Sequence, residues 1–240
     1  MVRPIKSKQI PNLQEAIKSV AWKQIGESGA SSLSLRSIAR ELKISAPAIY
    51  NYFADRDALV TALIVDAFRS FGDYQHQAMA RFKEPGESVE RLYAIGRAYR
   101  EWALAYPQHY VLIFGNPIPG YTFPEAETLP VMEHSRSALT GIIGELHAKG
   151  MLNVPDSLRT LSAPGQVPPN MGGCQGGEEF LVSIISMLIW SRVHGLVSLE
   201  LGRMMPDADD VSTTLYQLEL DLITSQFVNI RNTGGDPAQS

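Results

Sequence analysis

The side chains best suited to contact a nucleic acid lie within residues 34–59. Arg36 offers a planar guanidinium group that can donate two parallel hydrogen bonds to a guanine base. Further along, Tyr50, Asn51 and Tyr52 offer two hydroxyl groups and one amide that can bond to bases or phosphates. These donors can act on DNA only if the chain holds them on one exposed surface. The secondary-structure elements around them therefore decide whether they can contact DNA together.

Two short helices are predicted to carry these donors. Ser34 can cap the first, over residues 35–42, in which apolar residues recur at helical spacing. Residues 43–45 then break this helix, and Ser45 can cap a second helix over residues 46–52.

The second helix is expected to turn Ile49 and Phe53 inward against the first helix. Its other face then carries Ala46, Ala48, Tyr50, Asn51 and Tyr52. Two short helices that cross at a tight turn form a helix-turn-helix, and the second helix of such a unit suits a major groove.

The stretch IARELKISAPAIYNYFADRDAL, residues 38–59, resembles the DNA-binding signature of the tetracycline-repressor (TetR) family of bacterial transcriptional regulators. The resemblance extends from Leu13 to about Ile64. Its order I-A-x-x-L-x-I-S-x-x-A-I-Y-x-Y-F is far more specific than a bare helix-turn-helix. Two positions depart from the family pattern: Lys43 stands where the turn often has Gly, and Arg56 stands where the family usually has Lys.

Ten residues are expected to contact double-stranded operator DNA, and the resemblance implies the contacts of Ala46, Pro47, Ala48, Tyr50 and Tyr52. Arg36 is the expected base reader, and Asn51 is expected to contact a base or a phosphate. For Tyr50, packing within the small bundle is the alternative to a phosphate contact. Contacts to bases or sugars are expected from Ala46, Pro47 and Ala48. Contacts to phosphates are expected from Ser34, Ser45, Tyr50, Tyr52 and Arg56.

Charge is unevenly distributed along the chain. Residues 1–60 hold nine Lys/Arg and five Asp/Glu, a net of +4, and the rest hold twelve and twenty, a net of −8, which together give the −4 of the whole chain. A basic head on an acidic body indicates that only the head meets phosphates, unless the asymmetry is chance.

A soluble, cytoplasmic protein is expected. The apolar run FLVSIISMLIW is shorter than a membrane span, and Lys6 and Lys8 lead into polar residues rather than into a secretory signal. The single cysteine, Cys174, excludes an intrachain disulfide and a Cys-rich metal site, and it is taken as incidental rather than as a redox sensor.

Helical periodicity without a strand pattern predicts an all-α fold. An N-terminal three-helix bundle with the helix-turn-helix is assigned to residues 1–56, a helical ligand-binding and dimerisation domain to 57–232, and a flexible tail to 233–240. Asn12 can cap the first helix and Gly29 can end it. The other expected helices cover residues 57 to about 72, with Gly72 ending or bending the helix, and 87–106, 107–114, 125–149, 178–201 and 209–230.

Residues 150–177 contain six Gly and four Pro and are expected to be a mobile linker or lid. The helix over 178–201 is apolar all round, so burial on several sides is expected. The helix over 209–230 has apolar residues near heptad spacing, and this pair of helices can pack against its copy in a homodimer.

The segment WSRVHGLVSLELG, residues 190–202, resembles the Trp-His-Gly mark of the WHG-type regulatory domain found in part of the TetR family. LIFGNPIPG, residues 112–120, resembles a loop of the same subgroup. Trp190 and His194 lie one turn apart on one helix face. Both are expected to be core residues, with His194 hydrogen-bonded internally, or alternatively to contact a ligand.

Aromatic residues beyond Asp57 are candidates to line an effector pocket, and simple core packing is the alternative for each of them. The candidates are Phe68, Phe71, Tyr93, Tyr99, Trp102, Tyr110, Phe114, Trp190 and His194. A lipophilic or aromatic ligand wedged beside Phe68 and Phe71 would tilt the helix from Asp57 and respace the two recognition helices, which would release a repressor from its operator.

The sequence lacks a phosphate-cradling Gly loop, metal-ligand spacing and a nucleophile elbow, so we expect no enzyme, no metal and no cofactor. Two other readings stay open. One is a helical enzyme with an N-terminal bundle, which substrate turnover would reveal. The other is a nucleoid-type DNA binder without an effector, whose DNA affinity would not respond to any ligand.

Overall fold

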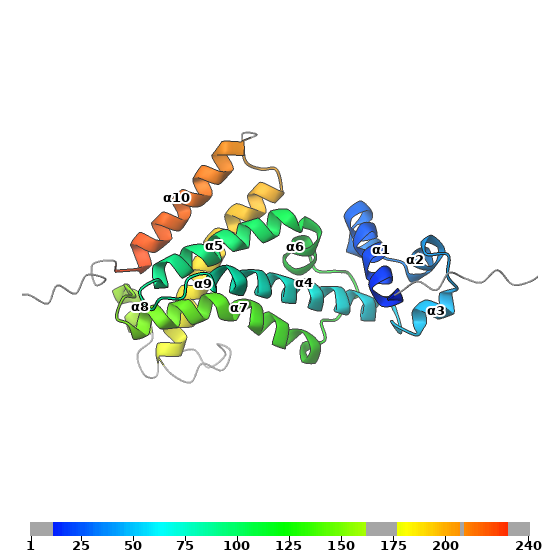
Figure 1. Ribbon diagram of the computed structural model, residues 1–240, viewed down its shortest axis with the longest axis horizontal. Helices are drawn as coiled ribbons and strands as arrows, with labels where there is room; N and C mark the ends of the chain where they lie inside the picture. The colour runs from blue at the N-terminus through cyan, green and yellow to red at the C-terminus, as the bar shows by residue number, and fades with distance from the viewer. Residues whose placement is uncertain (1–11, 162–176, 207–208, 230–240) are drawn as a thin grey trace, which may run out of the picture. The chain divides into compact units, whose positions relative to one another are not determined.

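The computed structural model describes residues 12–161, 177–206 and 209–229, and within these ranges the chain is all-α, as predicted. Its one β feature there is an isolated antiparallel bridge between Leu152 and Val228. The elements, labelled in Figure 1, are α1 (Leu13–Ser28), η1 (Ala30–Ser32), α2 (Leu35–Glu41), α3 (Ala46–Tyr50), α4 (Arg56–Met79), α5 (Ser88–Ala105), α6 (Pro107–Phe114), α7 (Glu125–Ala148), α8 (Asp156–Leu161), α9 (Gly177–Leu201) and α10 (Asp209–Phe227).

These helices form two compact units. Unit 1 combines Met1–Ser70 with Tyr106–Met132, and unit 2 combines Phe71–Ala105 with Glu133–Ser240. Each unit therefore joins segments that are distant in the sequence. The predicted flexible tail, residues 233–240, lies outside the described residues.

The ends of α1 are set by local chemistry, as predicted. The Asn12 side chain accepts a hydrogen bond from the backbone N–H of Glu15 at 3.4 Å, which satisfies one of the free donors at the helix start. Gly29, with φ at 78°, ends the helix, and its N–H donates to the carbonyl of Ile25. Between these caps Ile17 and Ala21 are fully buried.

The helix-turn-helix is present, with two differences from the sequence prediction. Ser34 caps α2 through its hydroxyl, but the Ser45 side chain makes no capping hydrogen bond at the start of α3. Pro47 has no N–H to offer, and the N–H of Ala48 donates to the Ser45 carbonyl instead. α3 also ends at Tyr50 rather than at 52, because the next turn tightens and the Tyr52 N–H donates to the Ile49 carbonyl at 2.8 Å.

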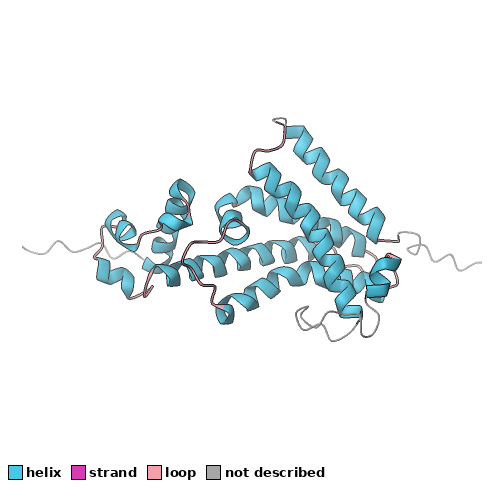
Figure 2. Ribbon diagram, turned by 180° about the vertical axis from the view of Figure 1, so that it is seen from behind, coloured by secondary structure: helices cyan, strands magenta, loops and turns pink. Residues whose placement is uncertain are grey.

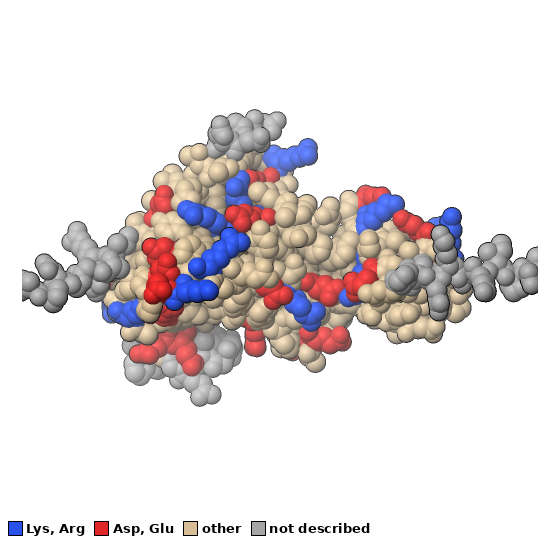
Figure 3. All heavy atoms as spheres, in the orientation of Figure 1, with Lys and Arg blue, Asp and Glu red and all other residues tan. Residues whose placement is uncertain are grey.

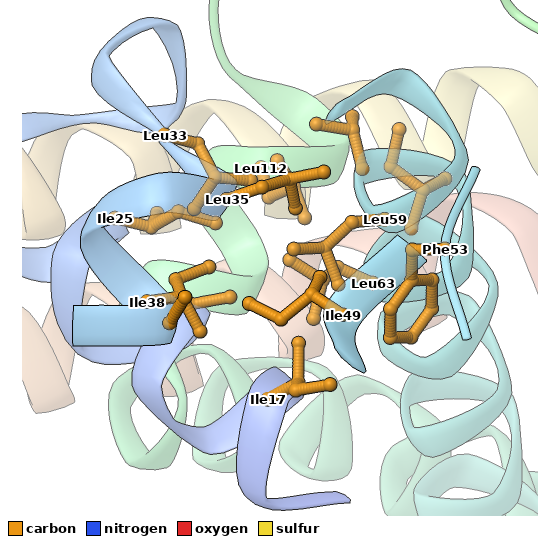
Figure 4. Close-up of a cluster of buried hydrophobic side chains, with 14 of the residues drawn as sticks. Ile17, Ile25, Leu33, Leu35, Ile38, Ile49, Phe53, Leu59, Leu63 and Leu112 are labelled. Carbon is orange, nitrogen blue, oxygen red and sulfur yellow. The ribbon is translucent and has the colours of Figure 1, made fainter. Parts of the chain in front are cut away.

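One apolar cluster holds unit 1 together. Ile17, Ile38 and Ile49 are fully buried in it, and Phe53 on the chain after α3 is 4% exposed, as its predicted inward position requires. Figure 4 shows these side chains converging together with Leu112. Leu112 comes from α6, so a segment distant in sequence helps to close the core of the helix-turn-helix.

Unit 2 contains the C-terminal part of α4, and this helix does not end at Gly72 but continues to Met79. α7 passes so close there that a Cβ on Gly72 would lie 2.6 Å from the His134 Cδ2 atom and 3.0 Å from the Ser135 Cα atom. Just after Gly72, Asp73 bonds to the His134 ring at 2.8 Å and Gln75 donates to the Ser135 carbonyl. Gly72 is therefore a contact point between two helices rather than a helix breaker.

The prediction of a mobile segment over residues 150–177 is wrong for its first part. The Met151 carbonyl accepts from the Asn229 N–H at 2.7 Å, the Leu152–Val228 bridge follows, and α8 is formed. Met151, Leu152 and Val154 are buried, which ties this segment to the end of α10. Residues 162–176, with Cys174, lie outside the described residues.

α9 packs against α5 and α10, and Figures 1 and 2 both show α9 and α10 side by side. Burial on several sides was predicted for α9, but Met187 is 54% exposed and Leu188 40% exposed in the single chain. Among the described helices α9 alone has the length and apolar composition to cross a membrane. The core helix of a soluble protein meets the same criteria, and α9 carries a buried face with Ile185 and Val197 fully enclosed.

We expect Gly72→Ala to lower the free energy of unfolding by roughly 1–3 kcal/mol, because the new methyl group must displace the His134 ring and the backbone of α7. Gly141→Ala is the matched control, since a Cβ there meets open space within the same α7. That change should stabilise the helix by roughly 0.5–1 kcal/mol. Chemical denaturation of both variants measures the difference, and equal effects would contradict the close contact.

Candidate functional site

The outward face of α3 and the residues after it carry three of the predicted DNA contacts in exposed positions. Tyr50 and Tyr52 are each 47% exposed, and Asn51, the C-cap of α3, is exposed as well. The exposure of Tyr50 gives little support to the alternative that its side chain packs within the bundle. Ile49 is fully buried, so α3 buries this apolar side chain and leaves the hydroxyl-bearing Tyr50 exposed.

The start of each helix holds the remaining small and hydroxyl-bearing candidates. Ser34 uses its hydroxyl to cap α2, whereas Ser45 is exposed and forms no cap hydrogen bond. Pro47 is exposed in the first turn of α3, with Ala46 and Ala48 half-buried beside it.

Three cations on α2 and its following turn lack ion pairs. Arg36, Arg40 and Lys43 are exposed, and none of them forms a salt bridge to any residue that the structure describes. The other cations of residues 12–70 are paired with carboxylates, as in the 2.7 Å contact between Lys18 and Asp66. Among residues 12–70, uncompensated positive charge thus lies on α2 and the turn that precedes α3.

In unit 2 some cations are paired with carboxylates, and others, such as Arg81, Arg136 and Arg203, are exposed and form no salt bridge to a described residue. Arg91, Arg100 and Arg192 pair with Glu145, Glu200 and Glu219. Figure 3 shows Lys and Arg interspersed with Asp and Glu over the drawn face of this unit. Exposed cations without salt bridges therefore occur in both units, and among residues 12–70 they lie close together in the sequence, on α2 and the turn after it.

Arg56 is directed into unit 1. One guanidinium nitrogen donates to the carbonyl of Ala30 at 3.0 Å and, more weakly, to that of Ser31, and the other donates to Asp57 at 3.2 Å. Arg56 thus holds η1, the element that leads into α2. A phosphate contact by this residue remains a prediction, because two of its nitrogens are already engaged.

Five of the candidate effector residues come together in unit 2. Phe71 of α4 meets Tyr99 edge-on, with ring centroids 5.2 Å apart, and lies 4.9 Å from the ring of Trp102. The Tyr99 hydroxyl lies 2.9 Å from the His194 Nδ1 atom, and the imidazole stacks on Trp190 at 4.7 Å. The structure therefore assembles these aromatics from α4, α5 and α9.

The interior hydrogen bonding considered for His194 is present. Its Nδ1 atom faces the Tyr99 hydroxyl, and its Nε2 atom lies 3.4 Å from the Ser198 hydroxyl. Burial lowers the pKa of His194, so the neutral imidazole is favoured in the folded chain. A neutral imidazole, a phenol and a serine hydroxyl can orient the polar end of a mostly apolar ligand.

The other candidates lie apart from this cluster. Tyr93 donates from its hydroxyl to Asp221 on α10 at 2.8 Å, on an exposed part of unit 2. Phe68, Tyr110 and Phe114 belong to unit 1, where Phe114 contacts both other rings at centroid distances of 6.0 and 5.2 Å. The predicted lining set is thus divided between the two compact units.

Two partners of this site escaped the sequence prediction. Ser198 lies four residues after His194 on the same face of α9, so helical spacing alone identifies it as a neighbour. Glu200 receives two hydrogen bonds from Arg100, at 2.7 and 2.6 Å, across 100 residues of sequence. No local sequence pattern predicts the pairing of Arg100 with Glu200.

The lowered pKa of His194 gives a pH dependence with a defined sign. The folded chain binds this proton less readily than the unfolded chain, so the contribution of neutral His194 is present above the unfolded pKa of about 6.5 and lost as the pH falls through the folded pKa. We expect the Tm of the natural chain to fall more between about pH 7.5 and about pH 5.5 than that of His194→Gln. Tyr99→Phe keeps the imidazole and should keep most of the pH dependence while lowering the Tm throughout. A Tm profile of His194→Gln parallel to that of the natural chain would contradict this assignment.

Comparison with known families covers both units. Residues 17–63 match the family described as "Bacterial regulatory proteins, tetR family", and residues 92–223 match "Tetracyclin repressor-like, C-terminal domain". These descriptions do not mention the WHG type, which stays a resemblance of residues 190–202.

Curated relatives and solved structures agree with these family matches. The chain is 30% identical over 190 residues to the HTH-type transcriptional regulator Rv1816 of Mycobacterium tuberculosis, covering 78% of this chain and 80% of the relative. The solved regulatory protein SCO4313 has a TM-score of 0.69 and 31% identity, over 90% of this chain and 100% of its own. FadR from Bacillus subtilis, solved in complex with stearoyl-CoA, shares the fold with a TM-score of 0.62 at 13% identity, over 89% of this chain and 98% of its own. The chain belongs to the TetR family of bacterial regulatory proteins and is a transcriptional regulator.

Proposed function

We propose that this regulator is a cytoplasmic repressor that binds a palindromic operator as a homodimer and is released by a small lipophilic or aromatic effector. The observation that carries the proposal is the outward face of the helix-turn-helix. Tyr50, Asn51 and Tyr52 are exposed there, next to three cations without ion pairs. In a dimer the two recognition helices would enter successive major grooves, roughly 34–36 Å apart or somewhat more.

The roles on DNA follow from where each side chain lies. Arg36, exposed in the first turn of α2, is the proposed base reader, and Asn51 contacts a base or a phosphate. Ser45 fits a phosphate contact because its hydroxyl is not used to cap α3. Tyr50 and Tyr52 hold phosphates in this proposal, Ser34 and Arg56 anchor the backbone, and Ala46, Pro47 and Ala48 pack against bases or sugars.

The proposed homodimer uses α9 and α10. On α10 the exposed Leu215, Leu218 and Leu222 recur at spacings of three and four, so they form one apolar stripe, and Met187 and Leu188 extend the apolar surface on α9. Two copies of this helix pair packed about a two-fold axis would bury both stripes in a four-helix interface.

The proposed effector acts through unit 2. The cluster of Phe71, Tyr99, Trp102 and Trp190 favours a lipophilic or aromatic ligand, and His194 supplies a polar group within it. FadR, which shares the fold, is solved in complex with stearoyl-CoA, a molecule with a long acyl chain. α4 carries Phe71 and is continuous from Arg56 to Met79, so a shift of this helix would reach the DNA-binding unit. By linkage, operator DNA must weaken effector binding by the factor by which the effector weakens DNA binding.

DNA binding is tested by selecting preferred duplexes from a random-sequence pool with the purified protein and footprinting the promoter of its own gene. The proposal expects a palindromic footprint and an affinity that falls steeply with salt. Turnover of a substrate without sequence-specific binding would favour the enzyme reading. Sequence-specific binding that responds to none of a panel of lipophilic compounds would favour a regulator without an effector.

We expect Arg36→Ala to weaken binding to the selected operator by roughly 1–3 kcal/mol and to relax the preference at one base pair in each half-site. Its guanidinium is exposed and unpaired among the described residues, so its loss should leave the fold intact. Arg203→Ala in unit 2 is the control and should bind as the natural chain does. An unchanged ratio of operator affinity to random-duplex affinity in Arg36→Ala would refute the base-reading role.

Leu218→Glu should convert the dimer to a monomer, because it places a charge in the middle of the α10 stripe, where Leu218 is 51% exposed in the single chain. Sedimentation velocity at micromolar concentration measures the state. Leu104→Glu changes a leucine of similar exposure on α5 and should leave the dimer intact. A natural chain that sediments as a monomer at this concentration would count against the proposed interface.

A further inference from the structure

Lys43 holds a backbone conformation that glycine adopts more readily. Its φ is 56°, in the left-handed region that disfavours residues with a Cβ. The reason is the way α2 ends: the Ile44 N–H donates to the Ala39 carbonyl at 3.0 Å, and the Lys43 N–H donates to the Arg40 carbonyl at 3.2 Å. This pair of bonds is a Schellman motif, in which the residue at the position of Lys43 is usually glycine.

The chain repeats this motif at two other helix ends. At the end of α7 the residue in the left-handed position is Gly150, with φ at 65°. At the end of α9 it is Arg203, with φ at 53°, where Met204 and Arg203 donate to the carbonyls of Leu199 and Glu200. The motif therefore forms in this chain with glycine or with a cation.

A cation at a helix C-terminus gains from the helix dipole, which is a local reason for Lys43 and applies equally to Arg203. Lys43 differs from Arg203 in where it lies. It directly precedes α3, three residues before Ala46, which places its Cα within about 11 Å of that residue along the chain. A major groove is about 12 Å wide, so a side chain with a four-carbon stem at that distance can reach the phosphates beside the groove that α3 enters.

Charge supports the same assignment. Lys43 is exposed and makes no ion pair with the described residues, and Arg36 and Arg40 on the preceding helix are likewise unpaired. Within residues 12–70 the other cations are neutralised by carboxylates. A strained, unpaired cation next to a recognition helix is the kind of outlier that marks a functional position.

We propose that Lys43 contacts a phosphate of the operator backbone and that this contact is the role of a lysine at a glycine-favouring turn position. The inference rests on the proposed DNA binding and deepens it. Because a phosphate contact carries no base information, Lys43 would add affinity for every duplex and contribute about one released counterion.

The test measures the affinity of the full-length chain for a random-sequence duplex of about 30 base pairs as a function of salt. Lys43→Gly removes the charge and relieves the backbone, and Lys43→Asn removes the charge with another residue that tolerates the left-handed region. Lys43→Arg keeps the charge. Arg203→Gly is the matched control, since it makes the same change in the same motif within unit 2.

We expect the slope of log Kobs against log [salt] to become less steep by about 0.9 in both Lys43→Gly and Lys43→Asn and to stay unchanged in Lys43→Arg and Arg203→Gly. Thermal unfolding should show both glycine variants to be folded. If Lys43→Gly and Lys43→Asn both show the same salt slope as the natural chain, this inference is overturned while the proposed function stands. An equal change in Arg203→Gly would overturn it too, because the effect would then be one of net charge. A natural chain that binds no duplex would overturn the proposed function, and the inference with it.

Discussion

Burial of one apolar cluster is the constraint on which the DNA-binding unit depends, because its two functional helices are too short to be stable alone. α2 has seven residues and α3 has five, whereas isolated helices shorter than about 12–15 residues are marginal in water. Ile38 and Ile49 supply the burial from these helices, and Leu112 of α6 contributes from a distant segment. The angle at which α3 presents Tyr50 is therefore a product of packing against α1, α4 and α6.

Folding and proposed DNA contact use different side chains of the same helices. The buried positions of α2 and α3 are apolar, and Arg36, Tyr50 and Tyr52 stay outside the cluster. The exposed donors and cations can therefore serve a nucleic acid without reducing the core. Lys43 is also exposed, and its backbone lies in the left-handed region, with φ at 56°.

Unit 2 adds polar contacts to its apolar packing. Arg100 bonds to Glu200 and to Thr213, and the Tyr216 hydroxyl donates to the Gly96 carbonyl at 2.6 Å, so α5 is tied to both α9 and α10. A partly buried ion pair is costly to break from one side, because the remaining charge is left without its partner. These ties link α5, which carries Tyr99, to α9, which carries His194.

The sequence by itself determined what depends on neighbours within one helical turn. Periodicity and capping are local, so the sequence was enough to predict them. It predicted the caps of Asn12 and Ser34, the end of α1 at Gly29 and the inward positions of Ile49 and Phe53, and it carries the family signature. The tertiary structure alone decided features that join distant residues. α4 continues through Gly72 because α7 approaches there, Leu152 pairs with Val228, and Tyr99 meets His194 across 95 residues. Such contacts result from the packing of whole helices, which no short window of sequence encodes.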